Sequence, residues 1–315
     1  MSPHISVVIP CYNGSAFLRN AIDSALNQVH ANSEVVVVND GSTDDSLAIM
    51  ESYGARIKIV NQANAGLPAA RNAGIRTASG GLFAFLDADD WWEVDFLFKL
   101  SQALDANPKA AIAYCGWKNV GLSGRRGDAF IPPDYESLPD KIEKLLCNPR
   151  WPVHAAMIKR DPLFDAGLFD PALKSCEDFA LWLRTAIQNP IVRVPEVLAY
   201  YRHHGNQMIS NRARIALSHY DVQRAYLKQH PDVAEKYTQK TLRTLTKGEL
   251  LLRGYACYWQ RDLPAARKIF RAVMKQGYGT LTDWKYMLPA WLPESWHRWL
   301  VRQRDKQLHK PDSQL

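Results

Sequence analysis

The sequence has few cysteines, no long hydrophobic run and no signal-peptide pattern. Its five cysteines are odd in number and include no C-x-x-C pair, which argues against a disulfide framework and against a zinc site. No stretch approaches the roughly 18 consecutive apolar residues of a membrane-spanning helix, and the N-terminus leads directly into a strand-like run. From these absences we expect a cytoplasmic protein.

Acidic residues are scarce in the last third of the chain. Residues 201–315 contain 21 Lys and Arg against 9 Asp and Glu, a net charge of +12 (21 − 9), whereas residues 1–200 contain 18 against 23, a net charge of −5 (18 − 23). A region this basic suits anionic lipid, a phosphorylated acceptor or nucleic acid, and the alternative is an ordinary solvated helical surface. Nucleic-acid binding has no other support in the sequence, and we do not expect it.

Short apolar runs alternate with helical patterns in the first part of the chain. The runs with strand character are Ile5–Ile9, Glu34–Val38, Arg56–Val60, Leu82–Leu86 and Ala111–Tyr114. Between them, apolar residues recur at helical spacing, for example over residues 18–29 and 96–104. This alternation predicts an α/β fold with a mostly parallel sheet flanked by helices.

The strand pattern ends near residue 206. Beyond it helical spacing dominates, and residues 250–258 and 264–275 predict a helix hairpin joined through Gln260-Arg261-Asp262. We therefore predict an α/β domain over residues 1–206 and a basic helical C-terminal region over residues 207–315.

Polar turns follow three of the predicted strands. These turns are Pro10-Cys11-Tyr12-Asn13-Gly14, Asn39-Asp40-Gly41-Ser42-Thr43-Asp44 and Asp87-Ala88-Asp89-Asp90. In sheets of this kind, ligands bind beyond the carboxyl ends of the strands. We expect the three turns to converge on one edge of the sheet and to form a site there.

The acidic run 87–90 predicts a divalent-cation site. Hard cations such as Mg²⁺ and Mn²⁺ prefer carboxylate oxygens and substrate phosphates, and acids clustered at a strand end repel one another unless a cation lies between them. The alternative is capping of a helix predicted over residues 91–106, whose dipole an acid would stabilise. We assign that cap to Asp90, which leaves Asp87 and Asp89 for a ligand.

Two other groups near strand ends suit a phosphorylated nucleoside. The carboxylate of Asp40 can accept hydrogen bonds from a nucleobase or ribose, or can instead form an Asx-type turn. Pro68 lies near the start of a predicted helix and Arg71 follows three residues later, so a helix N-terminus and a guanidinium together suit a diphosphate. A salt bridge from Arg71 to a strand-end acid is the alternative, and the two roles are compatible.

Two later motifs offer acid–base and ligand chemistry. Glu177 and Asp178 open an amphipathic helical run, where a carboxylate can act as a general base toward a hydroxyl or can simply stabilise the helix start. Arg202-His203-His204 follows the strand-like residues 191–194, where a histidine can bind a metal or contact phosphate, or can have a purely structural role.

Taken in order, these motifs resemble those of the family 2 glycosyltransferases of the GT-A fold. The matching stretches are Val7–Asn13, Val38–Asp44, Ala70–Gly74, Phe85–Asp90, Gly167–Asp170, Glu177–Arg184 and Tyr201–His204. They span about two thirds of the chain, and the ordered set is specific although each stretch alone is loose. Two departures are mild: the stretch 167–170 lacks a second glycine before Phe169, and Ala69 stands where serine is more common.

The resemblance implies a nucleotide-sugar site at the predicted sheet edge. Its residues would be Pro10, Tyr12, Asn13, Asp40, Arg71, Asp87, Trp182 and Arg202. Within that set, Asp40 would lie nearest the base and Asp87 would approach the ribose, while Trp182 would also help to form the acceptor wall. The implied donor is UDP-linked, because the family favours UDP.

The resemblance also implies a metal site and a catalytic base. Asp89 and His204 would hold a divalent cation, Mn²⁺ or Mg²⁺, that bridges the donor diphosphate. Asp178, supported by Glu177, would remove the acceptor proton in a single displacement that inverts the sugar configuration. The expected enzyme is a metal-dependent hexosyltransferase that adds single sugars to a glycan or lipid-linked acceptor during assembly of a cell-envelope polysaccharide.

Two other functions deserve comparison with this one. A nucleotidyltransferase would need a glycine-rich, basic phosphate loop after the first strand, and Cys11-Tyr12-Asn13-Gly14-Ser15-Ala16 does not supply one. A non-catalytic nucleotide-sugar or glycan-binding protein on the same fold would be favoured by loss of the metal acids or of the base, but Asp89 and Asp178 are both present.

Tryptophan and basic residues are interleaved near the C-terminus. Trp284, Trp291, Trp296 and Trp299 alternate with Lys and Arg over residues 280–306. This pattern suits peripheral contact with an anionic bilayer at the inner face of the membrane. The alternative is that these tryptophans close a helical subdomain.

Overall fold

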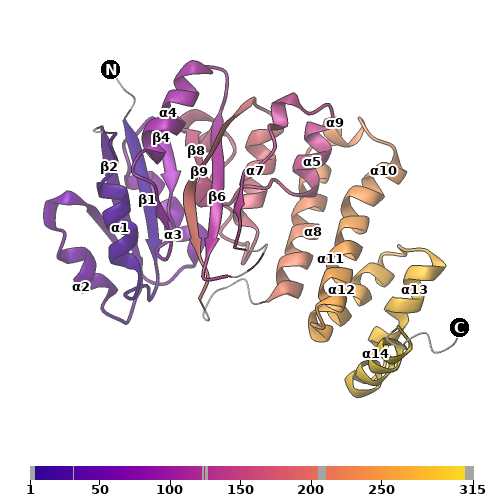
Figure 1. The fold of residues 1–315 in the computed structure, drawn as a ribbon. Helices are drawn as coiled ribbons and strands as arrows, with labels where there is room; N and C mark the ends of the chain where they lie inside the picture. Colours follow the sequence, from indigo (N-terminus) through magenta and orange to yellow (C-terminus); the bar gives the residue numbers. More distant parts are fainter. Residues whose placement is uncertain (1–3, 31, 123, 125–126, 205–210, 309–315) are drawn as a thin grey trace, which may run out of the picture. The chain divides into compact units, whose positions relative to one another are not determined.

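The computed structural model describes residues 4–30, 32–122, 124, 127–204 and 211–308, with side chains of the last helix described to residue 303. The chain divides into two compact units, Met1–Gln207 and Met208–Leu315. The first is an α/β unit, and the described residues of the second form helices joined by loops, with no strand (Figure 1).

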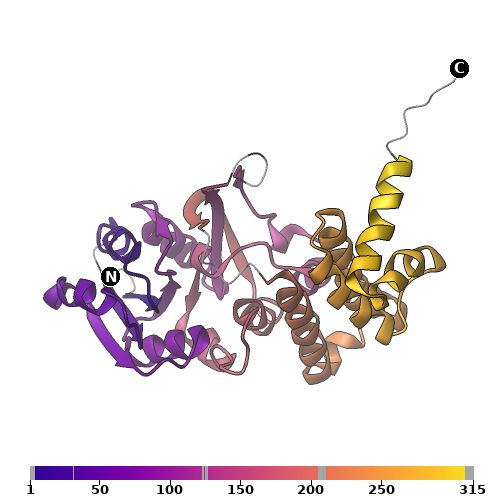
Figure 2. The same cartoon turned by 90° about the horizontal axis from the view of Figure 1, so that it is seen from below.

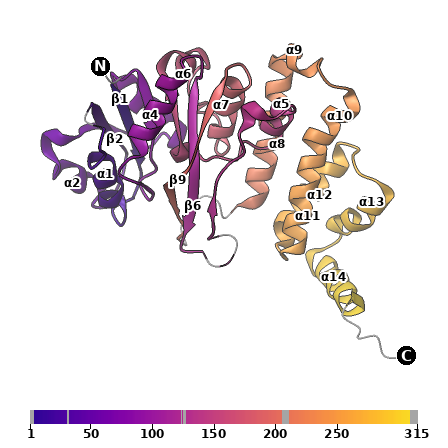
Figure 3. The same ribbon diagram turned by 45° about the horizontal axis from the view of Figure 1, so that its top comes forward.

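The α/β unit is built on one mixed sheet. In spatial order its strands are β3 (Lys58–Gln62), β2 (Ser33–Asp40), β1 (Ile5–Cys11), β4 (Leu82–Phe85), β8 (Ala156–Lys159), β6 (Ile112–Val120), β9 (Ile191–Arg202) and β5 (Trp91–Trp92), and β7 (Ala129–Phe130) pairs with β6. Strands β1 to β4 are parallel, and so are the long strands β6 and β9, which run side by side (Figure 3). The predicted α/β sheet is therefore present, but β8 is antiparallel to both of its neighbours.

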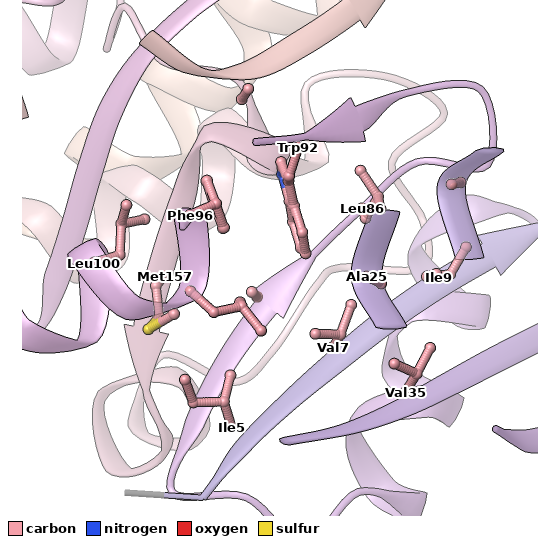
Figure 4. Close-up of a cluster of buried hydrophobic side chains, with 14 of the residues drawn as sticks. Ile5, Val7, Ile9, Ala25, Val35, Leu86, Trp92, Phe96, Leu100 and Met157 are labelled. Carbon is pink, nitrogen blue, oxygen red and sulfur yellow. The ribbon is translucent and has the colours of Figure 1, made fainter. Parts of the chain in front are cut away.

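Two apolar layers cover the sheet. The helices of this unit are α1 (Leu18–Leu26), α2 (Ser46–Glu51), α3 (Leu67–Thr77), α4 (Phe96–Ala106), α5 (Lys141–Cys147), α6 (Arg160–Asp165) and α7 (Glu177–Ala186). Side chains alternate along β1, so that Val7 and Ile9 pack with α1 and α4 (Figure 4) while Val8 packs with α3 and α7 on the other face. Contact with α3 is close: a Cβ at Gly74 would lie 2.4 Å from a Val8 methyl. This packing fixes the position of Arg71 on the same helix.

The helix predicted over 91–106 begins later than expected. Trp91 and Trp92 form β5, which pairs with Ala199 and Tyr200 of β9, and α4 starts at Phe96. The Trp91 and Tyr200 rings stack at a centroid distance of 5.1 Å. This cross-strand aromatic contact favours strand pairing over the first turn of a helix. Asp90 therefore does not cap α4, and the assignment of that cap to Asp90 was wrong.

The second unit packs its helices around a separate apolar core. Its elements are α8 (Arg212–Gln229), α9 (Pro231–Ala234), α10 (Gln239–Arg243), the π-helical turn η6 (Thr244–Gly248), α11 (Glu249–Trp259), α12 (Leu263–Lys275), α13 (Leu281–Met287), the 3₁₀ turn η7 (Leu288–Trp291) and α14 (Glu294–Leu308) (Figure 2). The predicted helix hairpin is α11 and α12, and Asp262 caps α12 by accepting from the Ala265 N–H. Among the described residues, no helix combines the length and apolarity needed to cross a membrane.

Candidate active site

The acidic turn after β4 is tied to the end of β9. Asp90 is fully buried, and its Oδ1 accepts a hydrogen bond of 2.8 Å from the backbone N–H of Arg202. The Arg202 guanidinium in turn donates from Nε to the Asp89 carbonyl at 2.9 Å and from Nη2 to Asn20 of α1. It also lies 4.4 Å from the centroid of the Trp91 ring. Arg202 is predicted to bind the donor. In the structure, its hydrogen bonds to Asp89 and Asp90 hold the acidic turn in position.

A buried histidine lies beneath this turn. His154 Nδ1 is 3.1 Å from Asp90 Oδ2, and both side chains are wholly inaccessible to solvent. Burial lowers the pKa of His154 to about 4, and burial together with the charges of Asp87 and Asp89 raises the pKa of Asp90 well above its usual range. His154 was not predicted, because its role comes only from burial next to an acid 64 residues earlier in the chain (154 − 90).

Asp89 and His204 form a pair with the geometry of two adjacent metal ligands. His204 Nε2 lies 2.9 Å from Asp89 Oδ2, and about 30% of each side chain remains exposed, at 28% and 30%. Ligand atoms about 2.1 Å from a six-coordinate cation lie about 3 Å apart when they are adjacent, so the separation fits Mn²⁺ or Mg²⁺. One carboxylate and one imidazole leave other positions open for phosphate oxygens.

A second group of ligand atoms lies deeper in the same region. One atom each of Asp87, Asp90 and His154 lies within 4.8 Å of the others. Because Asp90 and His154 are fully buried, a donor diphosphate could not share a cation held there. The exposed pair of Asp89 and His204 is therefore the better candidate for a substrate-bridging ion.

Arg71 joins the acidic turn to the start of α7. Its Nη2 donates to Asp87 Oδ1 at 2.7 Å and its Nη1 donates to Glu177 Oε1 at 2.8 Å, while only 1% of the side chain is exposed. The two carboxylates raise the pKa of the guanidinium against the opposing effect of burial. The guanidinium also lies 5.2 Å from the centroid of the Phe169 ring. Of the two interpretations of Arg71, the salt bridge is formed.

Asp178 lies in the first turn of α7, which begins immediately after Cys176 in the left-handed conformation (φ 63°). Burial, followed by the negative charge of Glu177, raises the pKa of Asp178 to about 7, and the nearby Arg71 opposes the shift. A carboxylate with such a pKa can hold or release a proton near neutral pH, as a general base requires.

Trp182, one turn further along α7, has a different environment from the one predicted. Only 1% of its side chain is exposed, and it packs in the apolar layer that contains Trp151 and Phe169. The centroids of the Trp151 and Trp182 rings are 6.1 Å apart. The resemblance that implied an acceptor wall at Trp182 did not reveal that this face of α7 points into the core. Trp182 supports α7 and does not line an open acceptor wall.

The loops after β1 and β2 are joined by hydrogen bonds. The Asn13 side chain accepts from the Thr43 N–H at 2.8 Å, and the Asn13 N–H donates to Ser42 at 3.0 Å. Asn13 takes a positive φ of 51°, a conformation in which asparagine is enriched. Pro10 is buried in β1, whereas Tyr12 is exposed and leaves its ring available for stacking.

Asp40 organises the loop that leads into α3. Its carboxylate accepts from the Gln62 side chain at 2.6 Å and from the backbone N–H groups of Ala65 and Gly66, both at 2.9 Å. The residue is almost fully buried. A carboxylate has about four acceptor positions, so these three bonds leave capacity for one further donor.

Comparisons with known proteins place the chain in a family. The model of glycosyl transferase family 2 matches residues 6–162. An uncharacterized glycosyltransferase of Rickettsia typhi is 33% identical over 230 residues, which cover 70% of each chain. The chain belongs to glycosyltransferase family 2. Another relative in this group, the uncharacterized glycosyltransferase EpsJ of Bacillus subtilis, is 32% identical over 66% of this chain and 63% of its own.

Solved structures share the GT-A-like fold of this family 2 member. The mannosyltransferase PcManGT from Pyrobaculum calidifontis, solved with GDP-Man and Mn²⁺, aligns with a TM-score of 0.56 at 20% identity over 96% of this chain and 85% of its own. S. aureus TarS 1–349, solved with UDP-GlcNAc, aligns with a TM-score of 0.56 at 17% identity over 96% and 92%. At these identities the likeness establishes the fold.

Proposed function

We propose that this family 2 glycosyltransferase is a metal-dependent, inverting hexosyltransferase that uses a UDP-sugar. It transfers the sugar to a hydroxyl of a glycan or lipid-linked acceptor. One observation carries the proposal: Arg71 pairs with both Asp87 and Glu177, so the acidic turn and the helix that bears Asp178 meet at one point. Donor-binding and proton-accepting groups are thereby held next to each other.

The nucleoside lies over the loops after β1 and β2. The exposed Tyr12 ring offers a stacking surface, Asn13 ties its loop to Thr43, and Pro10 is buried in β1 just before that loop. The base donates to the remaining acceptor position of Asp40, and Asp87 accepts from the ribose with the oxygen that Arg71 leaves free. These contacts select the nucleotide and orient its diphosphate toward Asp89.

Asp89 and His204 hold the divalent cation. When bound, the cation offsets negative charge on the leaving diphosphate. The two residues are suited to this role because their ligand atoms are 2.9 Å apart and accessible. Arg202 keeps the Asp89 backbone in place through the bond to its carbonyl.

Asp178 accepts the acceptor proton. The acceptor oxygen forms a bond to the anomeric carbon while the bond from that carbon to the phosphate oxygen breaks, and the nucleoside diphosphate leaves with the electron pair. The proton of the attacking hydroxyl passes to the Asp178 carboxylate. Because the hydroxyl attacks from the face opposite the leaving phosphate, the configuration inverts. Glu177 raises the basicity of Asp178 by its charge and is itself oriented by Arg71.

The donor and the setting are supported by different observations. The likeness to TarS solved with UDP-GlcNAc supports a UDP-sugar, whereas that to PcManGT solved with GDP-Man makes GDP the necessary comparison. We propose single transfers in cell-envelope glycan assembly at the cytoplasmic face of a membrane, a setting that the basic helical unit supports.

Calorimetric titration of UDP, GDP and dTDP, each with and without Mn²⁺, tests this function. We expect micromolar, Mn²⁺-dependent binding of UDP and weaker binding of the other two. Slow release of UDP from a UDP-sugar in the absence of acceptor would then demonstrate turnover. A folded protein that binds none of the three nucleotides would overturn the proposal, and binding without any turnover on UDP-sugars with hydroxyl acceptors would favour a non-catalytic binding protein.

A further inference from the structure

The last helices of the second unit present large apolar side chains to solvent. Trp291, Trp296 and Trp299 are 52%, 65% and 58% exposed, and Leu288 and Leu300 of the same two elements, η7 and α14, are exposed as well. We call these five residues the tryptophan face. Trp284 differs from them, because it is only partly exposed and packs on the apolar core. The C-terminal tryptophans therefore divide into one that packs in the helical unit and three that do not.

Helix α14 is amphipathic with its aromatic side outward. His297 and Val301, on one side, are 1% and 4% exposed, whereas Trp296, Trp299 and Leu300 fall on the other side at i, i+3 and i+4 spacing. In an ordinary surface helix the aromatic side would face the core. An outward aromatic side on a helix of this length marks a surface that meets an apolar partner.

The backbone beneath the tryptophan face is anchored. Arg267 of α12 donates to the Leu292 carbonyl at 2.7 Å, and its Nη1 lies 3.4 Å from His297 Nδ1. Arg271 of α12 donates to the Ala290 carbonyl at 2.8 Å, with its guanidinium 5.2 Å from the Trp291 ring centroid. The exposure of the tryptophans is therefore a property of a fixed surface.

Charge decides between the possible occupants of this surface. Residues 208–315 contain 20 Lys and Arg against 9 Asp and Glu, a net charge of +11 (20 − 9). Lys285, Arg298 and Arg302 are exposed, although Arg298 also pairs with Glu294 at 2.6 Å. A second copy of the same unit would bring like charge against it. An anionic bilayer attracts the basic side chains, and indole rings are suited to its polar interface.

We propose that the tryptophan face docks the enzyme on anionic lipid bilayers, with α14 lying in the interface plane. Trp296, Trp299 and Leu300 enter the boundary between headgroups and acyl chains, and the basic residues contact lipid phosphates. Resting on the proposed function, this contact brings a lipid-linked acceptor to the enzyme without any membrane-spanning segment.

Vesicle flotation of the full chain tests the proposal. We expect binding to phosphatidylcholine vesicles that contain about a third phosphatidylglycerol, little binding to pure phosphatidylcholine, and loss of binding as salt screens the charges. The W296S/W299S double variant should lose at least about tenfold in partition coefficient, since two exposed aromatic anchors are removed. W259S is the matched control: Trp259 is also exposed in this unit but lies on α11, so vesicle binding should persist.

Two outcomes would overturn the proposal. The first is wild-type protein that stays unbound on anionic vesicles; the second is a folded W296S/W299S variant that binds as well as wild type. If the wild type is a dimer, the double variant is a monomer and neither binds vesicles, the face is instead an interface between copies. UDP binding and melting temperature should match wild type in every variant, so failure of lipid docking is distinguishable from failure of the proposed catalytic function.

Discussion

Arg71 of α3 donates to Glu177 of α7 at 2.8 Å, across 106 positions of sequence. The same guanidinium pairs with Asp87 after the end of β4. The buried Arg71 side chain therefore fixes the relative positions of the acidic turn and the helix that carries Asp178. A buried cation between two carboxylates is balanced only while both partners remain, and removal of one leaves an uncompensated charge.

Replacement of Arg71 should therefore destabilise the fold. R71A leaves Asp87 and Glu177 without their shared partner, and we expect a loss of about 3–5 kcal/mol in the free energy of unfolding. R71K should recover part of that loss, because an ammonium cannot reproduce the forked geometry that bonds both carboxylates. Urea denaturation measures both effects. R76A on the exposed side of α3 is the control and should change stability by less than about 0.5 kcal/mol; an R71A protein as stable as R76A would contradict this account.

Removal of the Asp178 carboxylate should abolish turnover without affecting donor binding. D178N keeps the size of the side chain but cannot accept the proton, so kcat should fall by about 10²–10⁴. The dissociation constant for UDP with Mn²⁺ should stay within about twofold of wild type, because in the proposed function Asp178 acts on the acceptor and not on the nucleotide. The control D165N, at an exposed position on α6, should retain full activity. A D178N enzyme with wild-type kcat would assign the base to another residue.

The pH dependence of turnover follows from the same carboxylate. Burial raises the pKa of Asp178 to about 7, so a large fraction of the base is protonated and inactive at pH 6. We expect kcat to rise about tenfold per pH unit on the acidic side and to level off above the pKa. Rates measured at saturating donor and Mn²⁺ give this profile, and a kcat that is flat between about pH 5 and 8 would be incompatible with Asp178 as the base.

The contribution of Asp178 to the free energy of unfolding should fall as pH rises, whereas its contribution to turnover should increase. The pKa of Asp178 in the folded state, about 7, lies above its ordinary value of 3.8, so the folded protein binds the proton more tightly than the unfolded chain does. This residue therefore costs no stability below about pH 4, and its cost grows as pH rises toward 7. D178N removes the cost, so the variant should gain melting temperature over wild type at pH 8 and not at pH 4. An equal difference at both pH values would argue against the raised pKa.

Much of this site could be predicted from local sequence, because the end of each parallel strand is marked by a change from apolar to polar residues. The turns that carry Asp40, Asp87 and Asp89 can be located in this way from the sequence alone. What could not be predicted depends on contacts between distant segments. The antiparallel pairing of β8, the use of Trp91 and Trp92 as a strand, and the inward orientation of Trp182 are each decided by a partner element.

The same reasoning applies to the functional side chains. Asp90 and Asp89 are adjacent and chemically identical, yet one is fully buried against His154 and the other is partly exposed beside His204. The local pattern does not show their different surroundings, since these come from segments 64 and 115 residues away. The sequence could therefore indicate an acidic turn suited to a metal and could set Asp90 apart, but it could not show that Asp90 is buried against His154 instead of capping a helix.

The last prediction concerns the metal and follows from the difference in exposure between Asp89 and Asp90. D89N and H204A each remove one of the two accessible ligand atoms, so the Mn²⁺-dependent part of UDP affinity should fall by about 10- to 100-fold in either variant. The control is H203A, because His203 is adjacent in sequence and its Nε2 lies 2.8 Å from Asn119 Oδ1 of β6. Calorimetry of UDP with Mn²⁺ and with EDTA separates the metal-dependent part from the rest. If H203A loses as much Mn²⁺ dependence as H204A, the cation is not held by the pair of Asp89 and His204.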